Sequence, residues 1–140
     1  MIEEVVFYTL EKTIKKYRQF AQSRLDQAGL DITVDQWMVL GVIKDHPDLS
    51  QLEVAERVFK DQASIARITE LLVRKGYLSK SPHDTDRRKS LLELTDEGQV
   101  LLSRIIPAVE QYRQDALDHI SLEEVTRLKI VLEKIFQNCS

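Results

Sequence analysis

Three adjacent cations, Arg87, Arg88 and Lys89, lie between two short segments that could each form a β-strand. The chain as a whole is acidic, with a formal net charge of −3. Residues 60–89 nevertheless hold eight basic and four acidic side chains, so this segment carries +4 and the remainder of the chain −7. Charge segregated in this way builds a local positive field that attracts polyanions. The alternative is a charged turn that is merely solvated.

A second group of side chains with possible binding chemistry lies on a helix expected from about Asp61 to Lys75. At 100° per residue, Ile65, Ile68 and Leu72 fall within one narrow arc, which predicts a buried face. The opposite side of the helix is polar or small-chained and carries Ala63, Ala66, Arg67, Glu70 and Arg74.

This helix follows a shorter one after a tight connection, which is the layout of a helix-turn-helix. In that motif the second helix enters the DNA major groove, and its N-terminal residues reach base edges. Gln62 can read adenine, whereas Arg67 can reach guanine or a phosphate. Arg74 fits a phosphate contact and a solvated helix face equally well. The residues expected to contact DNA from this helix are Gln62, Ala63, Ser64, Arg67 and Arg74.

The hairpin that would carry the three cations is expected from residues 77–80 (YLSK) and 90–94 (SLLEL). The residues between them include Pro82, Asp84 and Asp86, which favour turns and predict a long loop. Beside the second helix, such a loop would lie along the DNA backbone or enter the minor groove, whose negative potential suits an inserted arginine. Asp86 would ion-pair with a neighbouring arginine and hold the loop in shape.

Local signals predict the helices that position these two elements. Gly29 is a natural stop for a first helix. A very apolar and therefore central helix should begin at Thr33, and Thr95 should open a long one in which Pro107 predicts a kink or local break. In the short helix from Ser50, Leu52, Ala55 and either Val58 or Phe59 should face inward. Capping-box spacing occurs at Thr33-x-x-Gln36, Ser50-x-x-Glu53 and Ser121-x-x-Glu124.

Composition limits the remaining possibilities. With 140 residues, 43% of them hydrophobic and 31% charged, the chain is expected to form one globular unit over 1–140. No apolar run approaches the ~20 residues of a membrane helix, and no signal peptide is recognisable. The one cysteine, Cys139, fits a reducing compartment and is expected to be a packing residue, with an intersubunit disulfide as the alternative. We therefore expect a cytoplasmic protein.

Enzyme chemistry has no support in the sequence. A Gly-rich phosphate loop, a nucleophile–base pattern and a close carboxylate pair are all missing, so we expect neither catalysis nor a cofactor. His46, His83 and His119 are far apart and show no ligand-pair spacing, which argues against a metal site.

The middle of the chain resembles the winged helix-turn-helix of the MarR family of bacterial and archaeal transcription regulators, and the flanking helices fit the same plan. The most specific match is Asp86-Arg87-Arg88, followed seven residues after Arg88 by Thr95. The other matching features are Ala55-Glu56, Ser64 with Arg67, Leu71-Leu72-x-x-Lys75-Gly76-Tyr77-Leu78 and Leu94-Thr95-x-x-Gly98.

The resemblance implies a mainly α fold with a small β-hairpin wing, in which a winged helix-turn-helix (33–95) is flanked by dimerisation helices (1–30 and 100–140). It implies that the second helix reads the major groove of double-stranded DNA and that Arg87 enters the minor groove. Many members repress promoters and release DNA when a small, often phenolic, effector binds. Some sense peroxides through a cysteine in the first helix, but this chain has none there.

A homodimer also follows from the apolar stripes of the terminal helices, which a 140-residue chain offers little else to bury. The alternative for the C-terminal stripe is packing within one subunit. The residues expected at the dimer seam are Leu10, Ile14, Val125, Leu128, Leu132 and Ile135.

Aromatic side chains near the junction of the dimerising and DNA-binding parts could line an effector pocket, although aromatics at helical spacing are also typical of a core. They are Tyr17, Phe20, Trp37 and Tyr112. The sequence thus predicts a MarR-type regulator, with a repressor binding a palindromic operator as the first hypothesis. A winged-helix protein-interaction module without a transcriptional role is the alternative.

Overall fold

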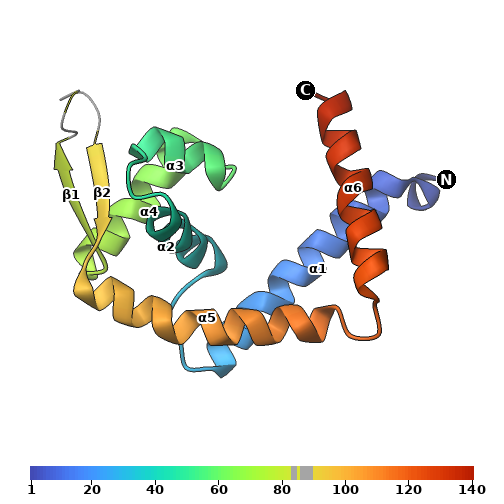
Figure 1. The fold of residues 1–140 in the computed structure, drawn as a ribbon, viewed down its shortest axis with the longest axis horizontal. Helices are drawn as coiled ribbons and strands as arrows, with labels where there is room; N and C mark the ends of the chain where they lie inside the picture. The colour runs from blue at the N-terminus through green and yellow to red at the C-terminus, as the bar shows by residue number, and fades with distance from the viewer. Residues whose placement is uncertain (83–84, 86–89) are drawn as a thin grey trace.

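The computed structural model describes residues 1–82, 85 and 90–140, and it consists of helices and one antiparallel hairpin. The long helix α5 (Asp96–Ala116) runs along the base of the molecule (Figure 1). At one end of α5 lies a winged lobe, made of α2, α3, α4 and the hairpin; at the other end lie α1 and α6 (Figure 1). The remaining elements are a 3₁₀ turn (Ile2–Glu4), α1 (Val6–Gln27), α2 (Val34–Asp45), α3 (Gln51–Arg57), α4 (Gln62–Arg74), β1 (Leu78–Pro82), β2 (Ser90–Leu94) and α6 (Leu122–Asn138).

The helices begin where the capping signals predict. The hydroxyls of Thr33, Ser50, Thr95 and Ser121 each accept a hydrogen bond from the backbone N–H three residues later. Each bond satisfies one of the N–H groups that a helix N-terminus leaves without an intrahelical partner. Gly29, with a φ of +73°, follows the end of α1 in the left-handed conformation that glycine adopts without steric cost.

The core of the winged lobe forms where α2 packs against α4, α5 and the hairpin. Leu40 of α2, Leu72 of α4 and Leu92 of β2 are all essentially inaccessible to solvent. Helix α2 is therefore central, as its apolar sequence predicts. The core continues along α5 through Leu102 and Ile105.

The hairpin is closed at its base by backbone pairing and by the start of α5. Leu78 pairs with Leu94 and Pro82 with Ser90, and a single bridge from Ser50 to Leu91 attaches the hairpin to the residue before α3. The Thr95 hydroxyl, which caps α5, also donates to the carbonyl of Gly76 over 2.6 Å. The hairpin is therefore fixed to α3, to α5 and to the segment that follows α4.

Two details differ from the sequence-based expectation. Helix α5 continues through Pro107 as one helix, so of the two predicted alternatives, a kink or a local break, the local break is wrong. In α3, Ala55 and Val58 face inward, but Leu52 is 48% exposed and Phe59 is 82% exposed. Val54 occupies the buried position instead, because a helix of two turns presents only a narrow face to the core.

The apolar stripe of α6 is not covered by its own chain. All of α6 lies in the described part of the chain, and none of its residues is buried. Leu128 is 54% exposed and Leu132 36% exposed, while Val125 and Ile135 are partly buried. The N-terminal half of α1 is similar: Leu10 is partly buried and Ile14 is 53% exposed. The single chain therefore leaves the two leucines of the α6 stripe largely uncovered, which favours a dimer seam over packing within one subunit.

Within the described residues, none of the helices combines the length and apolarity that crossing a membrane requires. The same residues contain no group of three or more His, Cys, Asp or Glu side chains arranged to hold a metal ion.

Gly98 tests the join between the hairpin and α5. A Cβ atom at this position would lie 2.2 Å from the carbonyl oxygen of Tyr77, which belongs to backbone that cannot rotate away. We expect Gly98→Ala to lower the free energy of unfolding by about 3 kcal/mol, at the upper end for overpacking, measured by urea denaturation. Gln99→Ala, at the exposed neighbour, is the control; equal stability of the two variants would contradict the close packing.

Candidate nucleic-acid interface

Helices α3 and α4 form a helix-turn-helix whose turn spans residues 58–61. The backbone N–H of Lys60 donates to the Ala55 carbonyl over 2.9 Å, and Asp61 caps α4 by accepting from the Ser64 N–H over 2.6 Å. Hydrogen bonds from Ser64 are the main cause that lowers the pKa of Asp61. The cap is thus ionised at neutral pH and lies at the positive end of the helix dipole, where negative charge is stabilising.

The inner face of α4 is held by burial and by one polar contact. Ile65 and Leu72 are buried in the core. Thr69 is also buried, and its hydroxyl lies 2.9 Å from the Ile65 carbonyl and 3.1 Å from Oε1 of Gln51 in α3. This arrangement fixes the angle of α4 to α3 and leaves one side of α4 facing outward.

The outer side of α4 carries the residues that the sequence singled out. Gln62, Ala63, Arg67 and Arg74 are exposed, and Ser64 is partly buried. The Arg67 guanidinium lies 3.4 Å from the Ser64 hydroxyl, so it extends back along the helix toward its N-terminus. The small side chains at the N-terminal end of α4 would allow the helix backbone to approach a nucleic acid closely. The polar side chains beside them could form hydrogen bonds with the edges of its bases.

The hairpin stands beside α4, and the pair of Pro82 and Ser90 forms the end of its strands away from α5 (Figure 1). The turn from α4 into β1 is short, with the Tyr77 N–H donating to the Leu72 carbonyl over 3.0 Å. Arg87, Arg88 and Lys89 lie outside the described residues, as does Asp86. The described strands bring the two ends of that loop together at Pro82 and Ser90.

Ion pairs join α1 to α2 and to α5, and no local sequence pattern indicates them. Asp35, in the first turn of α2, pairs with Arg18 of α1 through one oxygen and with Lys60 through the other, the latter over 3.0 Å. Partial burial works to raise the pKa of Asp35, but the hydrogen bonds from Lys60 and Arg18 outweigh it and the pKa is lowered. Asp35 therefore remains charged between two cations.

A second ion pair links α1 to α5. Arg24 lies 2.6 Å from Asp115. This contact, followed by a hydrogen bond from Gln111, lowers the pKa of Asp115. Arg24 also lies over the ring of Phe20, 5.5 Å from its centroid.

One of the four aromatics proposed for an effector pocket, Tyr112, contacts two of the others. The ring of Tyr112 meets those of Tyr17 and Phe20 edge-on, with centroid distances of 6.1 and 6.3 Å. Tyr112 is buried, and this burial is the main cause that raises the pKa of its hydroxyl. These contacts are as expected of a core, so the cluster has a structural role whether or not it also binds a ligand.

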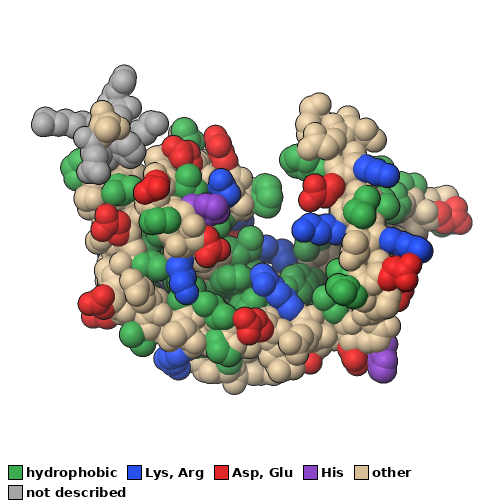
Figure 2. All heavy atoms as spheres, in the orientation of Figure 1, with side chains coloured by type: hydrophobic (Ala, Val, Ile, Leu, Met, Phe, Trp, Pro, Cys, Tyr) green, Lys and Arg blue, Asp and Glu red, His purple; other side chains and the backbone are tan. Residues whose placement is uncertain are grey.

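Trp37 completes this region from α2. Its indole Nε1 is buried and makes no hydrogen bond of ordinary geometry within the described residues, although the Trp37 side chain is close enough to the Tyr112 hydroxyl to oppose the rise of the Tyr112 pKa. The Arg113 guanidinium lies 5.5 Å from the centroid of the Trp37 ring. Figure 2 shows that the molecule is hollowed between the winged lobe and α6, with hydrophobic and basic side chains on the visible walls.

The arrangement of α3, α4 and the hairpin on α2 and α5 is that of a winged helix-turn-helix. A model of the MarR family matches residues 30–89. The transcriptional repressor NicR of Pseudomonas putida is 29% identical over 137 residues, which cover 98% of this chain and 85% of NicR. In residues 30–89 and in its fold, this chain is therefore similar to the MarR family of winged-helix transcription regulators.

Solved structures agree with this similarity. BpsR of Bordetella bronchiseptica, whose DNA binding is regulated by 6-hydroxynicotinic acid, superposes with a TM-score of 0.88 at 25% identity over 96% of this chain and 95% of BpsR. A mutant of MarR from E. coli complexed with operator DNA gives a TM-score of 0.87 at 23% identity, over 96% and 97% of the two chains. The second likeness shows the shared fold.

Proposed function

We propose that this protein is a sequence-specific DNA-binding transcription regulator that represses its target promoters as a homodimer bound to a palindromic operator. The observation that carries the proposal is the outward face of α4, which is polar, basic and lined by small side chains at its N-terminal end. An α-helix of this kind fits the major groove, which is wide enough to admit it and displays a distinct donor and acceptor pattern for each base pair.

The division of labour among the site residues follows from their chemistry. Gln62 and Ser64 offer hydrogen bonds to base edges, and the Ala63 methyl can touch a thymine methyl. Arg67 reaches a guanine or a phosphate, and Arg74, two turns further along α4, is placed for a phosphate. Arg87, Arg88 and Lys89 would extend the contact from the wing into the adjacent minor groove.

The exposed apolar side chains of α6 support the proposed homodimer. Leu128 and Leu132 are more exposed than core leucines, although they continue a stripe that begins at Val125 and ends at Ile135. A two-fold pairing would bury this stripe together with Leu10 and Ile14 of α1. It would also present two α4 helices about one DNA turn apart, roughly 10 bp, as a palindromic site requires.

An aromatic acid is the effector class that the junction between the winged lobe and α1 would suit. Tyr17, Phe20, Trp37 and Tyr112 supply aromatic surface, and Arg113 beside Trp37 supplies a cation for a carboxylate. The indole N–H of Trp37, which makes no hydrogen bond of ordinary geometry to the residues that the structure describes, offers a further donor. Binding at this junction would change how the winged lobe sits on the terminal helices and so release the operator.

A regulator of this kind works beside the chromosome, and we assign it to the cytoplasm on that ground. The second candidate function is a winged-helix protein-interaction module without a transcriptional role. The two differ in their affinity for DNA, since the interaction module should bind no DNA fragment at nanomolar concentration.

The DNA contacts can be tested with an operator selected from fragments of the source genome. We expect Arg67→Ala to weaken binding at least tenfold, because a contact of this type contributes about 1–3 kcal/mol. A phosphate contact would also make the slope of log K against log salt shallower by about 0.9 per protomer, whereas a base contact would leave the slope unchanged. Arg87→Ala should weaken binding while the dimer stays intact.

Arg104→Ala, an equal loss of charge at an exposed site on α5, serves as the control for both variants. Operator affinity equal to wild type in Arg67→Ala would remove the proposed role of α4, and the same result in Arg87→Ala would remove that of the wing.

The dimer seam can be tested by placing a charge in the α6 stripe. We expect Leu128→Glu to raise the dimer dissociation constant by about 1,000-fold, because each of two leucines loses about 2 kcal/mol of apolar burial. Leu132→Glu should behave in the same way. Analytical ultracentrifugation measures the change, and Gln137→Glu, on the opposite side of α6 by helical spacing, is the control. An intact Leu128→Glu dimer at micromolar concentration would contradict the seam.

The effector site has a built-in probe, because Trp37 is the one tryptophan of the chain. We expect 6-hydroxynicotinic acid to quench its fluorescence at the same concentrations at which it releases the operator. Nicotinamide, which lacks the carboxylate, should do neither, and Phe20→Ala should weaken both effects of the acid. Unchanged fluorescence across a full titration would remove this aromatic cluster as a site for this class of acid.

A further inference from the structure

Asp35 lies where three parts of the chain meet. Its carboxylate pairs with Arg18 of α1 and with Lys60 of the turn, and its own backbone belongs to the first turn of α2. Both cations are partly buried, with side-chain exposures of 41% for Arg18 and 31% for Lys60. One carboxylate thus connects a terminal helix to the segment that leads directly into α4.

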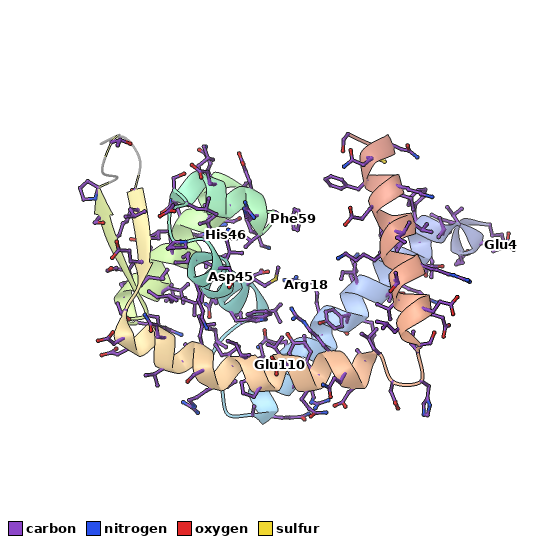
Figure 3. All side chains as sticks on the ribbon, viewed as in Figure 1. Glu4, Arg18, Asp45, His46, Phe59 and Glu110 are labelled. Atoms are coloured by element: carbon purple, nitrogen blue, oxygen red, sulfur yellow. The ribbon has the colours of Figure 1, made fainter. Side chains whose placement is uncertain are left out.

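The turn that Asp35 holds is strained at the residue before Lys60. Phe59 has a φ of +59°, in the left-handed region that a bulky side chain rarely adopts, and its ring is 82% exposed (Figure 3). A residue with a Cβ atom is unfavourable in this region, because the Cβ comes too close to the following carbonyl oxygen. Such a conformation persists only when the surrounding contacts determine it. The Lys60–Asp35 pair supplies one of them on the C-terminal side of Phe59, and the buried Val58 supplies another on the N-terminal side.

The consequence concerns the start of α4. Lys60 is followed at once by Asp61, which caps α4, and then by Gln62, Ala63 and Ser64. Any shift of Lys60 relative to α2 therefore moves the end of α4 that is proposed to reach base edges. A displacement of about 1 Å is enough to lose a directional contact of this kind.

We propose that Asp35 is a positioning residue for operator binding: by holding Lys60 and Arg18 together, it fixes the N-terminal end of α4 relative to α1. The inference rests on the proposed function, since it assigns a role in DNA binding to a residue that would not itself touch DNA. It extends that function to Asp35, an acidic residue that is not among the residues proposed to contact DNA.

The sign of the expected effect separates this role from simple electrostatics. Replacing Asp35 by Asn removes one negative charge from each protomer, which by itself would strengthen the attraction to a polyanion. A positioning role predicts the opposite, because the freed Lys60 no longer fixes the turn. Each operator-bound dimer contains two such carboxylates, so the loss counts twice.

The first measurement is operator affinity at fixed salt concentration. We expect Asp35→Asn to bind about tenfold more weakly than wild type, with an unchanged salt slope, and Asp35→Glu to recover much of the loss. Asp115→Asn is the matched control, because it removes the same charge from a residue that also pairs with an arginine of α1. Asp115, however, joins α1 to α5 rather than to the turn before α4. Wild-type or tighter binding by Asp35→Asn, or an equal loss in Asp115→Asn, would overturn the proposal.

The second measurement needs no DNA. Hydrogen exchange should be at least threefold faster in Asp35→Asn at the amides of Lys60, Ser64 and Ile65, and unchanged there in Asp115→Asn. If no fragment binds wild type, the proposed function fails, and exchange alone then decides whether Asp35 fixes the turn. Equal exchange in all three proteins would overturn that role even if the operator affinity changed.

Discussion

The burial of one side of α4 is the constraint on which the rest of the site depends. Ile65, Thr69 and Leu72 are enclosed by the lobe, and the side chains opposite them have no comparable cover. The helix therefore cannot rotate to hide its arginines without exposing two large apolar side chains, at a cost of about 1.5–3 kcal/mol each. The packing of the inner face of α4 therefore also determines which polar side chains are exposed on its outer face.

Most of the fold could be predicted from the sequence because its signals are local. A cap at Thr33 or Ser121 involves residues three apart, and the inner face of α4 repeats within one helix. Leu52 was misplaced because a seven-residue helix is too short for periodicity to choose among its apolar positions. Pro107 predicts a kink or a local break, and α5 continues through it as one helix in which Ile105 and Val109, on either side, are buried.

The site was harder to predict than the fold because its supports are remote in sequence. Arg18 and Asp35 are 17 residues apart, and Lys60 lies 25 residues beyond Asp35, with no pattern relating the three. The α6 stripe shows a different limit. Its spacing is the same whether a helix packs on its own core or on a second copy, so only the observed exposure of Leu128 separates the two. The aromatic contacts of Tyr112 could be expected to pack, but periodicity carries no information on which ligand would join them.

The continuity of α5 also has a mechanical meaning. Its 21 residues, at about 1.5 Å each, form a rod roughly 30 Å long. One end is bonded to the base of the wing through Thr95 and Gly98, and the other is tied to α1 through Asp115. Tilting such a rod by 5° about one end carries the other through about 2.6 Å, close to the length of a hydrogen bond. A small displacement of the terminal helices would thereby become a larger one at the winged end of α5, without the unfolding of any part of the protein.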